Sequence, residues 1–258
     1  MKGYLWVISA AALFTVGFAT SALADTSLEL VDPNNGSTLY VSDNGAIVCT
    51  GADACPGIPT DENSVAGAIT LAGITYDGYS ITVTTGGSNT PLCAGMNGPG
   101  CLNTTNITAT NISSGTATLD MYFASTGFNP PGVTGLIVGF STPGETGLTG
   151  TQQAYATSGA VNPLGSGVTN PTTGLSVCGP LLTLTGPTGN SSTGATCPAP
   201  GAPYSLELAT SFTTGVGGAF NLNGTISAVP EPVSITLFGT LLFGLAAMGR
   251  YRMRRNKA

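Results

Sequence analysis

The chain has 258 residues, only 7% of them charged, and its formal net charge at pH 7 is −6. All six Lys and Arg lie in the terminal segments, at position 2 and between positions 250 and 257, and the sequence contains no His. The part between them therefore lacks the basic side chains that bind nucleic-acid phosphates and the His and Lys of most catalytic devices.

The first predicted element is a signal peptide. Lys2 precedes an apolar run that ends at Ala19, and the small residues Ala22 and Ala24 follow it. This order predicts a secretory signal peptide over residues 1–24. An uncleaved N-terminal anchor is the alternative. We expect the chain to be exported across the inner membrane.

Hard oxygen donors gather in the loops that follow. They are Asp32, Asn34, Asn35, Asp43, Asn44, Asp53, Asp61 and Glu62. Carboxylate and amide oxygens suit Ca²⁺, but the same residue types are also typical of turns. Their spacing matches no calcium-loop motif, so turn structure is the favoured interpretation and no metal site is assigned.

All six cysteines lie in the part expected to be exported, where an oxidising compartment favours disulfides. Their order along the chain favours three local pairs, each closing a Gly/Pro-rich loop: Cys49–Cys55, Cys93–Cys101 and Cys178–Cys197. A zinc site is not expected, because the chain has neither a C-x-x-C motif nor a histidine.

Apolar and polar residues alternate with a period of two in four segments, which predicts half-buried strands at 79–84, 117–123, 206–212 and 220–226. Weaker candidates lie at 28–31, 46–49, 68–71, 107–113 and 136–141. These strands predict an all-β fold, an antiparallel β-sandwich that is jelly-roll-like or immunoglobulin-like, with long Gly/Pro-rich loops.

The stretch at about 141–203 differs in composition, because Gly and Pro are concentrated in it. Such a composition is typical of low-complexity sequence. Two strong strand patterns follow it, so we expect a long insertion with one short strand at 181–184 inside a single domain. That extracytoplasmic domain is expected to span residues 25–228.

The C-terminal region has three parts. Val229, Pro230, Glu231 and Pro232 form a short motif in which each proline favours an extended residue before it. An apolar stretch follows at 233–249 and predicts one transmembrane helix, somewhat short for a bilayer. The basic tail at 250–258 should stay on the cytoplasmic side.

Together these three parts resemble the PEP-CTERM protein-sorting signal of Gram-negative bacteria, and the resemblance is limited to residues 229–258. It implies recognition by an exosortase, a membrane-embedded cysteine transpeptidase-like enzyme that removes the helix and tail. It further implies release into the cell envelope or an exopolysaccharide biofilm matrix. A permanent single-pass anchor is the alternative. The tail positions that match the signal are Arg250, Arg252, Arg254 and Arg255.

Catalytic chemistry could come only from carboxylates, as in glycosidases. Asp120 and Glu207 lie within predicted strands, where alternation points both away from the core, so we expect a solvated face. Exposed Thr and Tyr faces could bind carbohydrate. Thr-x-Thr pairs could bind ice but are also ordinary on exposed strands. They occur at Thr82/Thr84, Thr108/Thr110, Thr116/Thr118 and Thr183/Thr185.

These observations favour a structural or adhesive protein of the envelope or extracellular matrix, with no enzyme activity and no cofactor. A polysaccharide- or calcium-binding module is the alternative. A carboxylate-only glycoside hydrolase and an ice-binding protein are less favoured. The expected partners are an exosortase-type processing enzyme, the inner membrane before processing, and exopolysaccharide, but not nucleic acid.

The sorting-signal interpretation predicts a specific C-terminus for the native protein. Because an exosortase removes the helix and tail, intact mass and C-terminal peptide analysis should place the end of the mature chain near residues 229–232. A native chain that ends at Ala258 would instead be a permanent anchor and would contradict release into the matrix.

Overall fold

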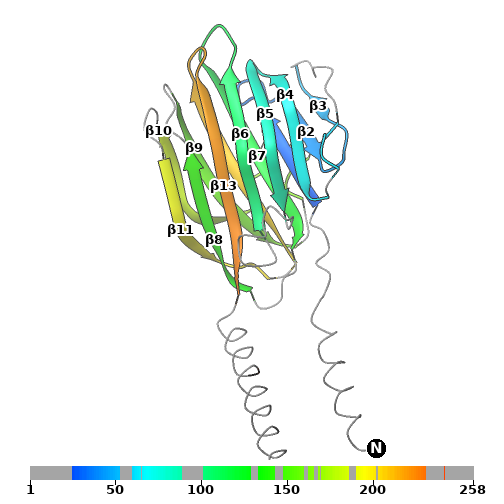
Figure 1. Cartoon of the computed structure of the whole chain (residues 1–258), viewed down its shortest axis with the longest axis vertical. Helices are drawn as coiled ribbons and strands as arrows, with labels where there is room; N and C mark the ends of the chain where they lie inside the picture. The colour runs from blue at the N-terminus through cyan, green and yellow to red at the C-terminus, as the bar shows by residue number, and fades with distance from the viewer. Residues whose placement is uncertain are drawn as a thin grey trace, which may run out of the picture.

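The computed structural model describes residues 25–52, 60–64, 66–88, 101–128, 133–142, 148–159, 162–165, 168, 170–185, 190–201, 203–230 and 241. Within these ranges the protein is all-β, with thirteen strands in two antiparallel sheets (Figure 1). The same ranges contain no helix long and apolar enough to cross a membrane. The signal peptide and the basic tail predicted above lie outside them, as does nearly all of the predicted C-terminal helix.

The two sheets are of similar size. The seven-stranded sheet has the order β10-β9-β12-β7-β1-β2-β3. Its strands are β1 (Asp25–Val31), β2 (Thr38–Ser42), β3 (Val48–Thr50), β7 (Ala117–Phe128), β9 (Thr149–Ser158), β10 (Ser176–Thr185) and β12 (Tyr204–Thr214). The six-stranded sheet has the order β11-β8-β13-β6-β5-β4. Its strands are β4 (Ala68–Tyr76), β5 (Tyr79–Ser88), β6 (Cys101–Asn111), β8 (Val133–Thr142), β11 (Asn190–Pro198) and β13 (Ala219–Pro230).

The sheets pack face to face as a β-sandwich, and the alternation seen in the sequence sets which side chains enter it. In β7, Leu119, Met121 and Phe123 are buried in the core while the residues between them point outward. Aromatic rings join the two sheets near the end where β12 finishes and β5 and β13 begin. Phe212 packs edge-on against Tyr79, with ring centroids 5.4 Å apart, and also contacts Phe220. The predicted β-sandwich is thus confirmed.

The Gly/Pro-rich stretch is not the long loop that its composition predicted. It forms β9, β10 and β11, and β9 lies inside the seven-stranded sheet between β10 and β12. Glycine allows two strands to pair closely here. A Cβ on Gly150 would lie 2.2 Å from the carbonyl oxygen of Ser211 on the neighbouring strand and would clash with it. Close backbone approach of this kind requires glycine. The stretch is therefore an integral part of both sheets.

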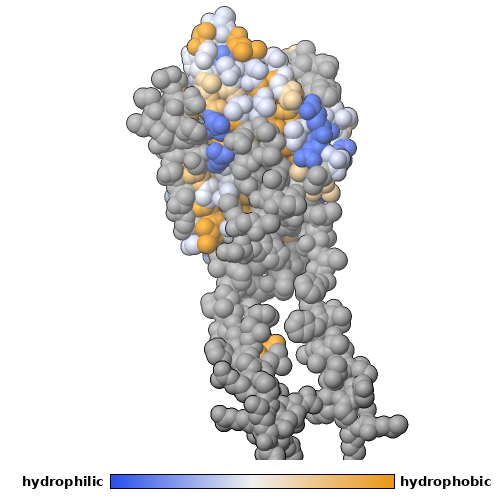
Figure 2. All heavy atoms as spheres, in the orientation of Figure 1, coloured by the Kyte–Doolittle hydropathy of each residue, from blue (hydrophilic) through white to orange (hydrophobic). Residues whose placement is uncertain are grey.

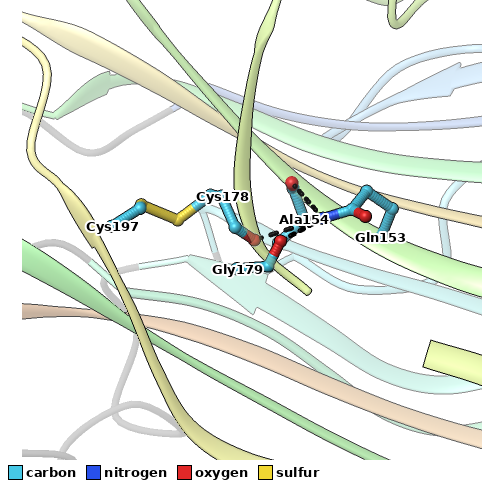
Figure 3. The surroundings of a disulfide bond; sticks show 5 residues. All are labelled: Gln153, Ala154, Cys178, Gly179 and Cys197. Atoms are coloured by element: carbon cyan, nitrogen blue, oxygen red, sulfur yellow. Dashed lines mark hydrogen bonds between the residues drawn. A yellow bond between two sulfur atoms is a disulfide. The ribbon is translucent and has the colours of Figure 1, made fainter. Parts of the chain in front are cut away.

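One predicted disulfide is confirmed. Cys178 on β10 is bonded to Cys197 on β11, with 5.1 Å between the Cα atoms (Figure 3). Because β10 and β11 are edge strands of different sheets, this bond ties the sheets together along one open side of the sandwich. Cys49 and Cys101 are also disulfide-bonded. Their predicted partners, Cys55 and Cys93, lie outside the described residues, so those two pairings stay predictions.

The last strand extends beyond the expected domain boundary at 228. In β13, Val229 lies opposite Gly135 and Pro230 opposite Val133, so the first two residues of the predicted sorting motif belong to the six-stranded sheet. Proline lacks the N–H needed inside a sheet and is tolerated at a strand end. The other two motif residues, Glu231 and Pro232, lie outside the described residues.

Candidate functional site

The outer faces of the two sheets differ in chemistry. The six-stranded sheet presents uncharged hydroxyl and amide side chains to solvent. They include Ser80, Thr82, Thr108, Thr110, Asn221, Asn223, Thr225 and Ser227. Thr82 lies opposite Thr108, but Thr118 and the pair Thr183/Thr185 belong to the other sheet. The Thr-x-Thr pairs therefore do not form one continuous surface.

The outer face of the seven-stranded sheet carries carboxylates and tyrosines. Glu29 lies between the core residues Leu28 and Leu30 of β1, so its side chain is on the outer face. It lies opposite Tyr122 of β7. Glu207 of β12 lies opposite Tyr155 of β9. Four adjacent strands, β1, β7, β12 and β9, thus bring these groups together although they are far apart in sequence.

Part of the chain between β9 and β10 lies against this face; we call its described residues (159, 162–165, 168 and 170–175) the covering segment. The side-chain oxygen of Asn162 accepts a hydrogen bond of 3.1 Å from the Ser27 hydroxyl, and its Nδ2 donates one of 3.4 Å to Tyr40. The backbone N–H of Gly165 donates to Glu29 Oε2 at 3.4 Å. Leu164, which belongs to the same segment, is only 5% exposed. The segment is therefore anchored on β1 and β2.

This cover removes the glutamates from solvent. Glu29 is 0% exposed and Glu207 is 1% exposed. Asp120 and Glu207 do point away from the core as predicted, but the expected solvated face is wrong: Glu207 is buried and Asp120 is half-buried. Strand alternation reports only which face a residue occupies and carries no information about a distant segment that folds over it. Glu29 shows the same alternation and was missed as a candidate.

Burial dominates the electrostatics of the pair. Both carboxyl oxygens of Glu207 and Oε1 of Glu29 lack a hydrogen-bond partner. Burial raises the pKa of each group to about 8. The hydrogen bond from the Gly165 amide partly lowers the pKa of Glu29 again. The charge of Glu29 raises the pKa of Glu207 further. Burial also raises the pKa of Tyr122, and so do the nearby charges of Asp120 and Glu207. With no cation bound, both glutamates are therefore protonated at neutral pH.

The pair is poorly arranged for glycoside hydrolysis. A glycosidase needs both carboxyl groups to face the scissile bond of a bound sugar. Here the covering segment lies over the pair, and Glu207 has almost no exposed surface. Asp120 lies one strand away, with its carboxylate bonded to Ser211. In this arrangement a polysaccharide cannot contact the two glutamates together.

The acidic loops considered for calcium have their oxygens engaged in turns. Asp32 Oδ1 accepts the backbone N–H of Asn34 at 2.7 Å, and Asn35 Oδ1 accepts that of Ser37 at 2.7 Å. Asp61 Oδ1 accepts the backbone N–H groups of Asn63 and Thr70. Across the described part of the chain, no cluster of three or more His, Cys, Asp or Glu is placed to hold a metal. Asp53 lies outside that part.

Two adjacent pockets open beside the covering segment and share Thr157, Ser158 and Gly174. One has a volume of about 510 Å³ and the other of about 500 Å³. Prolines, aliphatic side chains, hydroxyls and amides line them, and among the described lining residues none is charged or aromatic. The pockets lie at the end of the sandwich where β1 begins and β13 ends. Ser158 pairs with the first residue of β12, which pairs with the last residue of β7, and the end of β7 pairs with the start of β1. Other lining residues are Asn162, Pro171, Ser176 and Pro198.

No protein-family model and no curated protein matches the sequence. Among solved structures, TmCBM61 in complex with beta-1,4-galactotriose is 11% identical, with a TM-score of 0.30 over 59% of this chain and 83% of that one. A carbohydrate-binding module of the beta-sandwich superfamily is 14% identical, with a TM-score of 0.25 over 80% of this chain and 84% of that one. Arthrobacter globiformis T6 isomalto-dextranase complexed with panose is 18% identical, with a TM-score of 0.24 over 59% of this chain and 24% of that one. At TM-scores this low, these likenesses carry no argument about the site or its ligand.

The buried glutamates predict that the protein is less stable at alkaline pH. Their folded pKa of about 8 exceeds the ordinary value of 4.5. Their stabilisation is therefore complete below about pH 4.5 and is lost as the pH rises through 8. For one such group the full loss is on the order of 5 kcal/mol. Thermal unfolding in chelator-containing buffer should show the melting temperature falling by several degrees between pH 5 and pH 8.5.

Glu207→Gln is the matched test of this dependence, because it keeps the shape of the side chain and removes its charge. The variant should be more stable than the native chain at pH 8.5 and should show a flatter pH dependence. Glu62→Gln, at an exposed glutamate, is the control and should follow the native curve. A Glu207→Gln protein with the native pH dependence would show that Glu207 does not carry the effect.

Proposed function

We propose that the β-domain is a non-catalytic module that binds a neutral polysaccharide of the cell envelope or extracellular matrix. In this proposal the chain is exported, held at the inner membrane by its C-terminal helix, and then processed by an exosortase-type enzyme. The domain would hold the released protein to exopolysaccharide. This is the alternative that the sequence left open, and it gives the predicted adhesive role a molecular basis.

The chemistry of the paired pockets carries this proposal. Volumes of about 510 and 500 Å³ suit a small-molecule-sized group such as a few sugar rings. The lining offers the hydroxyls of Thr157, Ser158 and Ser176 and the amides of Asn162 and Asn170. It offers no charge to pair with an ionic ligand. Uncharged donors and acceptors suit the hydroxyl groups of a neutral saccharide.

The position of the pockets also fits processing. They lie at the end of the sandwich where β13 reaches Val229 and Pro230, the first residues of the sorting motif. Cleavage near residues 229–232 would separate this end of the domain from the helix. A polysaccharide chain could then approach the pockets without the membrane beside them.

A purely structural or adhesive role without a saccharide ligand is the second candidate. The opposite end of the sandwich carries exposed apolar side chains, seen as the orange group at the top of Figure 2. Ile112, which follows β6, is 56% exposed, and Val216, which follows β12, is 66% exposed. Asn111 ties the two loops together through backbone hydrogen bonds with Gly217 and Gly218. A contact made by this end would not involve the pockets.

The saccharide proposal predicts that filling the shared wall of the pockets abolishes binding. The full chain in non-ionic detergent should bind at least one neutral polysaccharide in a panel of α-glucan, β-glucan and galactan, measured by calorimetry or affinity electrophoresis. Ser158→Trp places a large ring where the two pockets meet, so affinity should fall at least about tenfold, or roughly 1.4 kcal/mol. Ser158 is exposed, so the fold should tolerate the change.

Thr183→Trp is the matched control, because Thr183 is exposed on β10 and does not line either pocket. It should bind like the native chain. Absence of binding to every neutral polysaccharide in the panel would contradict the proposal and leave the structural role. Equal loss in both variants would show that the pockets are not the binding surface.

A further inference from the structure

The two buried glutamates have no basic side chain with which to form an ion pair. Between Gly3 and Gly249 the chain contains no Lys, Arg or His, so no side chain of the described domain can form an ion pair with them. A buried carboxylate without a counter-charge is strongly unfavourable. Only a proton or a bound metal cation can neutralise Glu29 and Glu207.

The fold brings the two glutamates to the same covered region. They lie on β1 and β12, the two strands that flank β7. Glu29 pairs with Tyr122 of β7 and Glu207 pairs with Ala124, so the two glutamates lie on a diagonal across β7. Two strand spacings of about 4.8 Å and an offset of about 7 Å along the strands put their Cα atoms roughly 12 Å apart, a distance that two glutamate side chains tilted toward each other can largely span. Ala124 of β7 lies in the row between Ser27 and Glu207, and its small side chain leaves room on this face.

Three of the four carboxyl oxygens of this pair have no hydrogen-bond partner, although both residues are at most 1% exposed. The fourth, Glu29 Oε2, accepts one long bond from Gly165. Fully buried polar atoms are rarely left without a partner in folded proteins, and each such atom requires an explanation. A cation seated between the carboxyl groups would satisfy these oxygens and neutralise both charges.

We propose that Glu29 and Glu207 are the anionic ligands of a calcium site beneath the covering segment. Two carboxylates match the double charge of Ca²⁺. The neighbouring groups on the same face, the Ser27 hydroxyl and the Tyr122 phenol, offer oxygen rather than sulfur or imidazole nitrogen. Ca²⁺ accepts six to eight oxygens in flexible geometry, including water and backbone carbonyls, whereas Mg²⁺ demands a near-ideal octahedron.

The site lies apart from the acidic turns, whose oxygens are bonded to backbone N–H groups. It would connect the covering segment to the sheet, because Gly165 of that segment already contacts Glu29. Calcium binding at Glu29 would therefore strengthen the attachment of the covering segment to β1. No saccharide is needed to measure this, so a negative result would leave the proposed polysaccharide binding untouched.

The test is thermal unfolding and calorimetry of the full chain in non-ionic detergent at pH 7.5, after EDTA treatment and removal of the chelator. Added CaCl₂ at 1 mM should raise the melting temperature by roughly 5 °C or more, the shift expected for a ligand about 100-fold above its dissociation constant. Calorimetry should give one high-affinity site. MgCl₂ at the same concentration should give a clearly smaller shift.

The double variant Glu29→Gln/Glu207→Gln should lose the calcium shift. Without calcium it should be at least as stable as the native chain, because a buried glutamine, unlike these glutamates, does not have to take up a proton on folding. This separates loss of the site from loss of the fold. Glu62→Gln should keep the native response. No calcium shift in the native chain, an equal shift in the double variant, or loss of the shift in Glu62→Gln would overturn the assignment.

Discussion

The absence of basic side chains between Gly3 and Gly249 constrains every buried carboxylate in the described structure. An ion pair within the domain is impossible, so each acidic group must be solvated, hydrogen-bonded, protonated or bound to a cation. Asp32 and Asp61 are hydrogen-bonded, because their carboxylates accept backbone N–H groups. Glu29 and Glu207 have only one such bond between them. These two side chains can therefore be buried only when they carry a proton or bind a cation. The contact between the covering segment and Glu29 has the same requirement.

The covering segment relates the two candidate sites. Its inner side closes over the glutamates through Asn162 and Gly165, and its outer residues, among them Asn170 and Pro171, line one of the neutral pockets. The disulfide between Cys178 and Cys197 and the triple contact of Gln153 Nε2 with backbone carbonyls fix the strand that follows (Figure 3). At this face the two glutamates are thus kept inside, while the described lining of the adjacent pockets is uncharged, as the proposed binding of a neutral polysaccharide requires.

Much of the fold follows from local pattern. Period-two alternation predicted β5, β7, β12 and β13, and it predicted the correct face of the sheet for Asp120 and Glu207. The order of the cysteines along the chain predicted the Cys178–Cys197 bond. Composition failed for β9 to β11, because a Gly/Thr-rich stretch can pair as strands once neighbouring strands supply the partners, as Gly150 beside Ser211 shows. The burial of Glu29 and Glu207 could not be predicted, because it depends on contacts such as Ser27 with Asn162, more than a hundred residues apart.

The most direct measurement of the central claim is a pH titration of the glutamate carboxyl carbons by ¹³C NMR, on chain labelled at glutamate and freed of divalent cations. Resonances assigned to Glu29 and Glu207 by their Gln variants should titrate near pH 8, far above the ordinary 4.5. Titration of both near pH 4.5 would mean that the two groups are solvated as carboxylates. It would contradict the covered, charge-compensated pair on which both the pH dependence and the calcium site are built.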